Sequence, residues 1–408
     1  MASASFLLKI ESIRNRAKLL SKLRQMVALK PEQDIRPEQW EVLESQLSTV
    51  SNRILNSLRA RTDKYLPEVH KKEAAQAFID GLGSLEVDLA NAYTFYDTFM
   101  DILTQRLSDD IGPMLVGCDA IAADAMNRNF IGQVTIPPLV YCDRGFGAAT
   151  IREGVSIQKN VPNPIPIIAI PYARISEKYK LISIQHEVGH QALVKLNMVE
   201  QIRSLSREVL RAAGAPALIQ ELFARWSSEI GPDFWAFCLT GMAQTSSIRD
   251  VLILPHSLMF TISSVHPHPP AYLRFLISTE WCRQVWGTGD WDDWEKEWQT
   301  WYCPCHLDEA TKNTIATARK YIPIIAKALL KTRFRKLGNQ PISSLFNLEA
   351  LEPARLKSSA LALRQGLSAI QGQSPGVQLA VFRMAREYRT IKTPQIDAFM
   401  HQWLKNLK

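Results

Sequence analysis

Two histidines lie four positions apart in the stretch LISIQHEVGHQALVKLN at 181–197, with a glutamate directly after the first. On an α-helix, positions i and i+4 project from the same face, so His186 and His190 point the same way. Two imidazoles in this arrangement can bind one tetrahedral zinc ion at about 2.0–2.1 Å. Glu187 can accept a proton from the metal's water without being a ligand, and Gly189 leaves room for a neighbouring backbone. The stretch therefore predicts a zinc-binding helix; the alternative is an ordinary amphipathic helix with two incidental histidines.

A zinc ion in a catalytic site needs a third protein ligand. The segment WSSEIGPDFWAF at 226–237 places Glu229 and Asp233 four positions apart, on one face of a helix. One carboxylate can bind the metal while the other accepts the free N–H of a ligand histidine. Apolar neighbours predict that this face is buried, where two carboxylates are costly unless a cation or a donor offsets them. A surface acidic pair at a helix start is the alternative, and Glu208 and Glu221 are rival third ligands.

A histidine- and proline-rich turn leads into a helix in the segment SVHPHPPAYLRFL at 264–276. Hydrolysis through a tetrahedral intermediate needs a donor for the developing oxyanion. His268, Tyr272 and Arg274 can each supply one. The alternative is a proline-stiffened helix start with a structural arginine.

The chain before the zinc-binding stretch is richer in proline, glycine and β-branched residues than the N-terminal part. Short strands are therefore predicted at 136–142, 149–157 and 165–175. The last of these contains Pro166 and Pro171, which lack the N–H that a strand donates to its neighbour. We therefore predict an edge strand there rather than a central one.

Apolar residues recur at helical spacing through most of the remaining sequence. This pattern predicts a mainly α fold of the α+β type, with a small sheet and an active-site helix in a catalytic core that helical regions flank. The expected division is an N-terminal helical region at 1–110, the core at 111–275 and a C-terminal helical region at 276–408. Tryptophans gather between 281 and 301, and we expect most of them in the hydrophobic core.

The composition and charge of the chain limit the kinds of protein it can be and the partners it can bind. With 46% hydrophobic and 22% charged residues, the chain is typical of a globular protein. The net charge of +8 is scattered, without a basic stripe with interleaved aromatics, so no nucleic-acid partner is expected. No run of about 18 apolar residues occurs, which predicts no membrane span. No signal peptide is seen, and the 6 cysteines are irregularly spaced, so we expect a cytoplasmic protein; the oligomeric state stays open.

Together the three motifs resemble those of the CAAX-prenyl-endopeptidase-like family of zinc metallopeptidases, which belongs to the gluzincins. The family pattern is HExxH, then ExxxDxxA, then HPxxxxR. This sequence has HEVGH at 186–190, EIGPDFWA at 229–236 and HPPAYLR at 268–274, so every specified position is met. The resemblance covers about 165–275 and implies a zincin-like core.

The resemblance also implies roles for individual residues. The zinc ligands would be His186, His190 and Glu229, with Glu187 as the general base. Asp233 would lie behind a ligand histidine, and His268 and Arg274 would belong to the catalytic site. Many members are embedded in membranes, and this chain has no predicted span, so prenylated substrates are not implied.

The family also has an edge strand shortly before its active-site helix, ending in a proline, and IIAIP at 167–171 is similar. An extended peptide can add to such a strand through main-chain hydrogen bonds. On this interpretation the strand residues Ile167, Ile168, Ala169 and Ile170 bind the backbone of a protein or peptide substrate.

Two classes of function follow from these observations. The first is a zinc-dependent endopeptidase in which Glu187 activates a metal-bound water. The second is a non-catalytic binding or scaffold protein that keeps a zincin fold and acts through its helical flanks. A separate segment, Cys303-Pro-Cys305-His306, has half the ligands of a second metal site, although ordinary thiols are the favoured interpretation.

Overall fold

The computed structural model describes residues 4–131, 136–145, 147–158, 161–263 and 266–407. Helices hold 73% of the residues and strands 4%, which confirms the mainly α fold with a small sheet. Contacts divide the chain into two compact units. Unit 1 consists of Met1–Val116, Ile136–Cys142 and Ile151–Ile167, and unit 2 consists of Gly117–Thr135, Asp143–Thr150 and Ile168–Lys408. A compact unit need not be a folding domain, so the boundaries expected after residues 110 and 275 stay a prediction.

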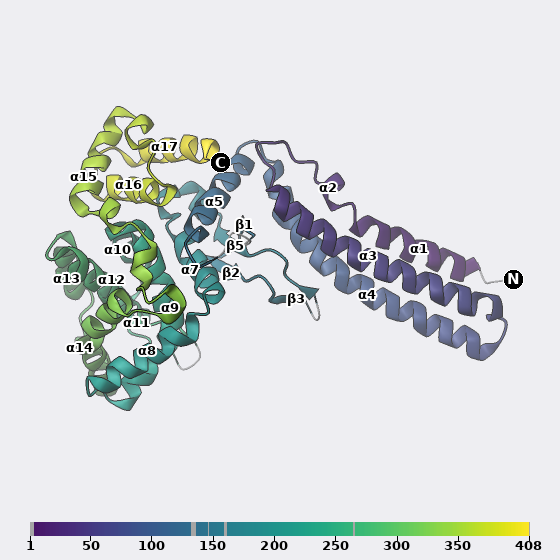
Figure 1. Cartoon of the computed structure of the whole chain (residues 1–408), viewed down its shortest axis with the longest axis horizontal. Helices are drawn as coiled ribbons and strands as arrows, with labels where there is room; N and C mark the ends of the chain where they lie inside the picture. The colour runs from purple at the N-terminus through teal and green to yellow at the C-terminus, as the bar shows by residue number, and fades with distance from the viewer. Residues whose placement is uncertain (1–3, 132–135, 146, 159–160, 264–265, 408) are drawn as a thin grey trace. The chain divides into compact units, whose positions relative to one another are not determined.

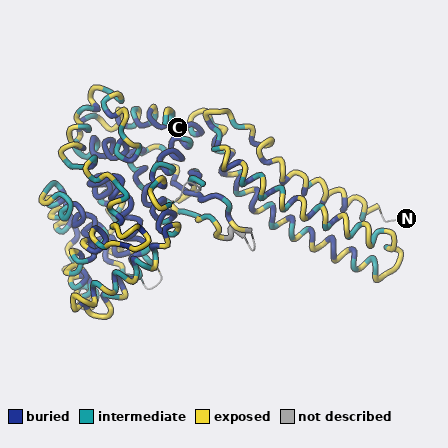
Figure 2. Tube along the Cα trace, in the orientation of Figure 1, coloured by how far each residue is buried: buried dark blue, intermediate teal, exposed yellow. Residues whose placement is uncertain are grey.

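Unit 1 is built on three long helices that lie side by side (Figure 1). Its helices are α1 (Ala4–Leu20), α2 (Leu23–Met26), α3 (Pro37–Tyr65) and α4 (Lys72–Thr104). Burial follows the helical period: in α3 the residues Leu43, Leu47, Ile54 and Leu58 are buried, at spacings that keep them on one face. Figure 2 shows the result, with buried and exposed residues alternating along each helix of the bundle.

Five short strands form the small sheets. They are β1 (Leu139–Asp143), β2 (Ala149–Ile151), β3 (Ser156–Gln158), β4 (Val161–Pro162) and β5 (Ile167–Pro171). β3 and β4 pair antiparallel, with Ser156 opposite Pro162, and the other three strands form a sheet in the order β1-β5-β2.

The expected edge strand is therefore wrong, because β5 is the central strand of the three. The prolines do not prevent this: Pro166 precedes β5 and Pro171 ends it, so neither removes a donor from the interior of the strand. The Pro166 carbonyl even accepts a hydrogen bond from the Leu139 N–H at 2.8 Å. All five residues of β5 are buried, and each side of the strand has a partner. Ile167–Ile170 thus lack the free edge that was expected to bind substrate.

Unit 2 is helical and surrounds one long, buried helix, α9. Its helices are α5 (Ile111–Met126, which begins in unit 1), α6 (Ala173–Ser176), α7 (Ser183–Lys195), α8 (Val199–Ala212), α9 (Ala217–Thr240), α10 (Met242–Val251), α11 (His256–Met259), α12 (Ala271–Trp286), α13 (Asp290–Trp301), α14 (Glu309–Lys331), α15 (Pro353–Ala362), α16 (Pro375–Glu387) and α17 (Thr393–Asn406). α9 packs against α7, α8 and α10, among others (Figure 1). Residues 229–240 are all buried, as expected of a helix that is covered on every side.

The tryptophan-rich segment lies mainly in the core of unit 2, as expected. Trp281, Trp291 and Trp298 are fully buried, whereas Trp301 is half exposed. Of the helices that the structure describes, none combines the length and the apolar character needed to cross a lipid bilayer.

Candidate metal centre

The centre lies where α7 and α9 pack with their backbones close together. Gly189 makes this approach possible: a Cβ at that position would lie 2.8 Å from the Pro232 Cα and 3.0 Å from the Trp235 Cβ. The room that the sequence predicted beside Gly189 is therefore confirmed, and its neighbour is the backbone of α9. Glu229 and Asp233 lie in the interior of α9, which excludes a surface acidic pair at a helix start.

Replacing Gly189 by alanine is expected to destabilise the protein by about 1–3 kcal/mol, because the added methyl group overfills a packed contact. It should also weaken metal binding, since α7 and α9 carry the ligands. The matched control is Gly83→Ala in α4, where a Cβ would meet nothing within 4 Å. That change should stabilise the helix by about 0.5–1 kcal/mol. Chemical unfolding of both variants is the measurement, and equal effects would contradict the packing argument.

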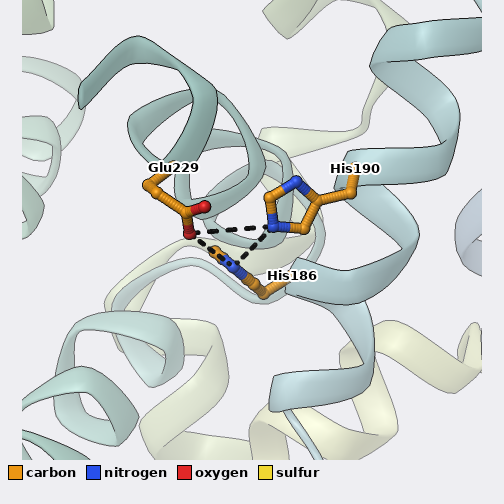
Figure 3. Close-up of side chains that lie close together, drawn as sticks. All are labelled: His186, His190 and Glu229. Atoms are coloured by element: carbon orange, nitrogen blue, oxygen red, sulfur yellow. Dashed lines mark hydrogen bonds and ion pairs between the residues drawn. The ribbon is translucent and has the colours of Figure 1, made fainter. Parts of the chain in front are cut away.

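Three side chains from these helices converge on one point (Figure 3). His186 Nε2 lies 3.1 Å from His190 Nε2. Glu229 Oε2 lies 3.4 Å from the first of these nitrogens and 3.7 Å from the second. Ligands of a tetrahedral zinc ion at 2.0–2.1 Å are about 3.3 Å apart. The three donor atoms therefore have the separations that one such ion requires.

Glu229 provides a second test of whether the site fits a metal. Its buried Oε2 atom makes no hydrogen bond of regular geometry to any described residue, although imidazole nitrogens of His186, His190 and His268 lie 3.4, 3.7 and 3.1 Å away. An unsatisfied buried acceptor is costly, and a cation at the centre of the three ligands would satisfy it. Burial by itself would raise the pKa of Glu229, but the imidazoles of His186 and His268 outweigh burial and hold that pKa well below its usual value. The carboxylate is thus ionised and suited to bind a cation.

Asp233 orients the first histidine. Its Oδ1 lies 2.8 Å from His186 Nδ1, and its two oxygens accept hydrogen bonds from Arg274 at 2.6 and 2.8 Å. Burial raises the pKa of Asp233, but the charges of Arg274 and His186 prevail and lower it to about 2. An ionised carboxylate can only accept, so His186 donates from Nδ1 and its Nε2 is turned to the metal position.

The two histidines differ in their affinity for a proton. Burial and the charge of His186 lower the pKa of His190 to about 4, so His190 is neutral at pH 7, as a metal ligand must be. Burial also lowers the pKa of His186, but Asp233 and Glu229 outweigh it and raise the pKa to about 9. The carboxylates therefore favour a positive charge at His186 Nε2, which either a proton or a divalent cation can supply.

A cavity of about 170 Å³ adjoins this centre within unit 2. Glu187 lines it beside His186, and burial raises the pKa of the Glu187 carboxyl toward the range of a useful base. Of the three candidate oxyanion donors, only His268 lies beside the metal ligands. Its Nε2 is 3.1 Å from Glu229 Oε2, and its side chain is 54% exposed. Arg274 lines the cavity but is held by Asp233. Tyr272 is buried against Phe260.

The rival third ligands lie elsewhere. Glu221 is at the protein surface, paired with Arg207 at 2.9 Å, and Glu208 is an exposed residue of α8. Cys303 and Cys305 are joined to each other by a disulfide rather than to a set of metal ligands. Within the described part of the chain, His186, His190 and Glu229 are the one group of three such side chains close enough to share an ion.

Several residues that line the cavity were not among those expected from the sequence. Arg174 comes from α6 and Ser183 from the start of α7, and α10 contributes Ile248 and Val251. Arg174 did carry a signal, because it is the one charged residue in the apolar run IPIIAIPYARI at 165–175. Nothing in the sequence of α10 indicated that its residues line the cavity, since only packing brings that helix to the metal centre.

Comparison with known proteins does not identify a family for this chain. No protein-family model, no curated protein and no solved structure matches the chain. The likeness to the CAAX-prenyl-endopeptidase-like family therefore stays a prediction from the three motifs, and the function must be argued from the geometry of the centre.

Proposed function

We propose that this protein is a zinc-dependent peptidase, and the motifs favour an endopeptidase. One observation carries the proposal. The ligand atoms of His186, His190 and Glu229 come from helices far apart in sequence, yet lie within 4.8 Å of one another, with one buried acceptor unsatisfied. A purely structural role for these side chains would leave the cost of that arrangement without compensation.

The choice of zinc and of hydrolysis rests on the donor set and on Glu187. Two imidazoles and one carboxylate, with a fourth position open, are the ligands of many catalytic zinc sites. Two histidines and a carboxylate also bind iron(II) in oxygenases, so the donors alone do not decide the metal. Glu187 favours hydrolysis, because an oxygenase does not require a buried base next to a ligand histidine, whereas a hydrolase does.

In the proposed mechanism, zinc would supply Lewis acidity, polarising the scissile carbonyl and lowering the pKa of a water molecule. Glu187 accepts the proton of the attacking water and later delivers it to the leaving amine. His268 donates a hydrogen bond to the carbonyl oxygen as negative charge develops there. Asp233 keeps His186 in the tautomer that binds the metal, and Arg274 offsets the charge of Asp233.

The test combines metal analysis with an assay of cleavage. The purified protein is expected to contain one zinc ion per chain and to cleave casein or a mixed peptide library. A chelator should stop cleavage, and added zinc should restore it. Iron in place of zinc, or zinc without cleavage of any library, would contradict the proposal. The second result would instead favour the non-catalytic scaffold.

A further inference from the structure

Arg174 is a buried arginine for which the described residues offer no ion-pair partner. Its side chain lines the cavity beside the metal centre, and only 7% of the residue is exposed. No carboxylate of the described chain lies within ion-pair distance of its guanidinium, and its Nε atom is buried without a hydrogen-bond partner. A buried charge in this condition is costly, because burial removes hydration that nothing in the protein replaces.

The acidic groups nearest to Arg174 are occupied by other cations. Glu177 pairs with Lys180 at 2.6 Å and accepts a hydrogen bond from the Tyr179 hydroxyl at 2.7 Å. Asp250 pairs with Arg383 at 3.0 Å. These carboxylates act on Arg174 only from a distance, and burial outweighs their attraction and lowers the pKa of Arg174.

Two other arginines of unit 2 show how a structural arginine is held in this protein: Arg383 is buried, and the Arg274 side chain is 17% exposed. Arg274 is held by both oxygens of Asp233, and Arg383 binds Asp250 together with the Ser246 hydroxyl and carbonyl. Both arginines have the partners that a buried guanidinium requires. Arg274 lines the same cavity as Arg174, so the difference lies in the partners: among the described residues, Arg174 has no carboxylate at ion-pair distance.

The cavity has further features of a binding site. The Ser183 hydroxyl also lines it and is buried, with no hydrogen-bond partner in the described part of the chain. The α10 side of the wall is mixed: Gln244 and Ser247 are polar, whereas Ile248, Val251 and Leu252 form an apolar part. The cavity of about 170 Å³ is far larger than one water molecule requires. The space therefore suits one short carbon chain with a hydrogen-bonding, negatively charged end.

We propose that Arg174, assisted by Ser183, binds a carboxylate group of the substrate in this cavity. The inference rests on the proposed function in taking the bound group to be part of a peptide. The carboxylate has two possible sources, the C-terminus of a peptide or the side chain of an aspartate or glutamate. A guanidinium matches the planar carboxylate in either case, and the apolar part of the wall contacts the carbon chain next to it.

The first experiment compares the cleavage sites chosen by the zinc-loaded wild-type protein and Arg174→Met. One peptide library carries free C-termini, and a second contains the same peptides amidated. If peptides are cleaved next to their last residue in the free library but not in the amidated one, Arg174 binds the C-terminal carboxylate. If both libraries are cleaved beside aspartate or glutamate, Arg174 binds the side-chain carboxylate. Arg174→Met should reduce kcat/KM at the preferred sites at least tenfold, mainly through KM. Unchanged sites and rates would overturn the inference.

A second experiment does not depend on cleavage. Butanoate and butanamide have the same shape and differ in charge, so their effects on the melting temperature isolate recognition of the carboxylate. Butanoate should raise the Tm of the wild-type protein more than butanamide does, both with zinc and after chelation. The difference should vanish in Arg174→Met and shrink in Ser183→Ala. Equal effects of the two probes on the wild-type protein would overturn the inference even if the protein is a peptidase. A difference without any cleavage would leave the inference standing and remove the proposed function.

Stability separates a binding role of Arg174 from a structural one. Replacing an unpaired buried charge by methionine should leave Tm unchanged or raise it, whereas loss of a structural arginine lowers it. The control for net charge is Arg211→Gln, at an exposed position of α8. Arg174→Lys keeps the charge and should restore part of the butanoate effect. A Tm of Arg174→Met clearly below that of the control would contradict the proposal.

Discussion

Glu187→Gln is expected to lower kcat by about 10²–10⁴-fold while zinc stays bound. Glutamine has nearly the shape of glutamate but cannot accept a proton from water. Glu187 lines the cavity next to His186, and burial raises the pKa of its carboxyl, so its effect should be on proton transfer rather than on the fold. The measurement is kcat on a peptide that the wild-type protein cleaves, together with zinc content and Tm.

His190→Ala is the matched comparison for this variant. It removes one of the three donor atoms at the centre, so zinc and cleavage should be lost together. The two variants thus separate the base from the ligand: one keeps the metal without turnover, and the other keeps neither. Wild-type rates in Glu187→Gln would remove Glu187 from the role of base. Full zinc occupancy in His190→Ala would remove His190 from the ligand set.

Asp233→Asn is expected to destabilise the protein by about 3–5 kcal/mol, because it leaves the buried Arg274 without its anionic partner. Zinc affinity should also fall by about 10–100-fold, since an asparagine no longer holds His186 in a single tautomer. Both effects follow from the position of Asp233, which is 2% exposed and bonded to His186 and Arg274 at once. Chemical unfolding of the zinc-free protein gives the first effect, and a competition titration with a chelator gives the second.

The double variant Asp233→Asn with Arg274→Met distinguishes the two effects. Removing both charges together should recover much of the lost stability, because no unpaired charge remains in the core. Zinc affinity should stay low, since His186 still lacks its anionic acceptor. If the double variant regained wild-type zinc affinity, Asp233 would be a partner of Arg274 alone, and its proposed effect on the ligand would be wrong.

Much of the local structure around the centre could be predicted from the sequence. The i, i+4 spacing of His186 and His190 placed both on one helix face, and the same spacing paired Glu229 with Asp233. The helical periodicity before and after these motifs predicted a mainly α fold. These features depend on the period of a single helix, so a short window of sequence contains all the information that they require.

Other features depended on contacts between distant segments. The sequence favoured Glu229 over Glu221 only through its pairing with Asp233 and the likeness to a family pattern, because which face of α9 packs against α7 is decided by tertiary contacts. It wrongly placed β5 at an edge, since the order of strands is set by pairing partners far along the chain.

Arg174 belongs to the same class: it lies in a segment predicted as a strand, and only the tertiary structure brings its side chain to the cavity, where no described carboxylate lies at ion-pair distance. The sequence by itself determined which residues share a helix face. The tertiary structure decided which faces meet, because that depends on the packing of side chains from many elements at once.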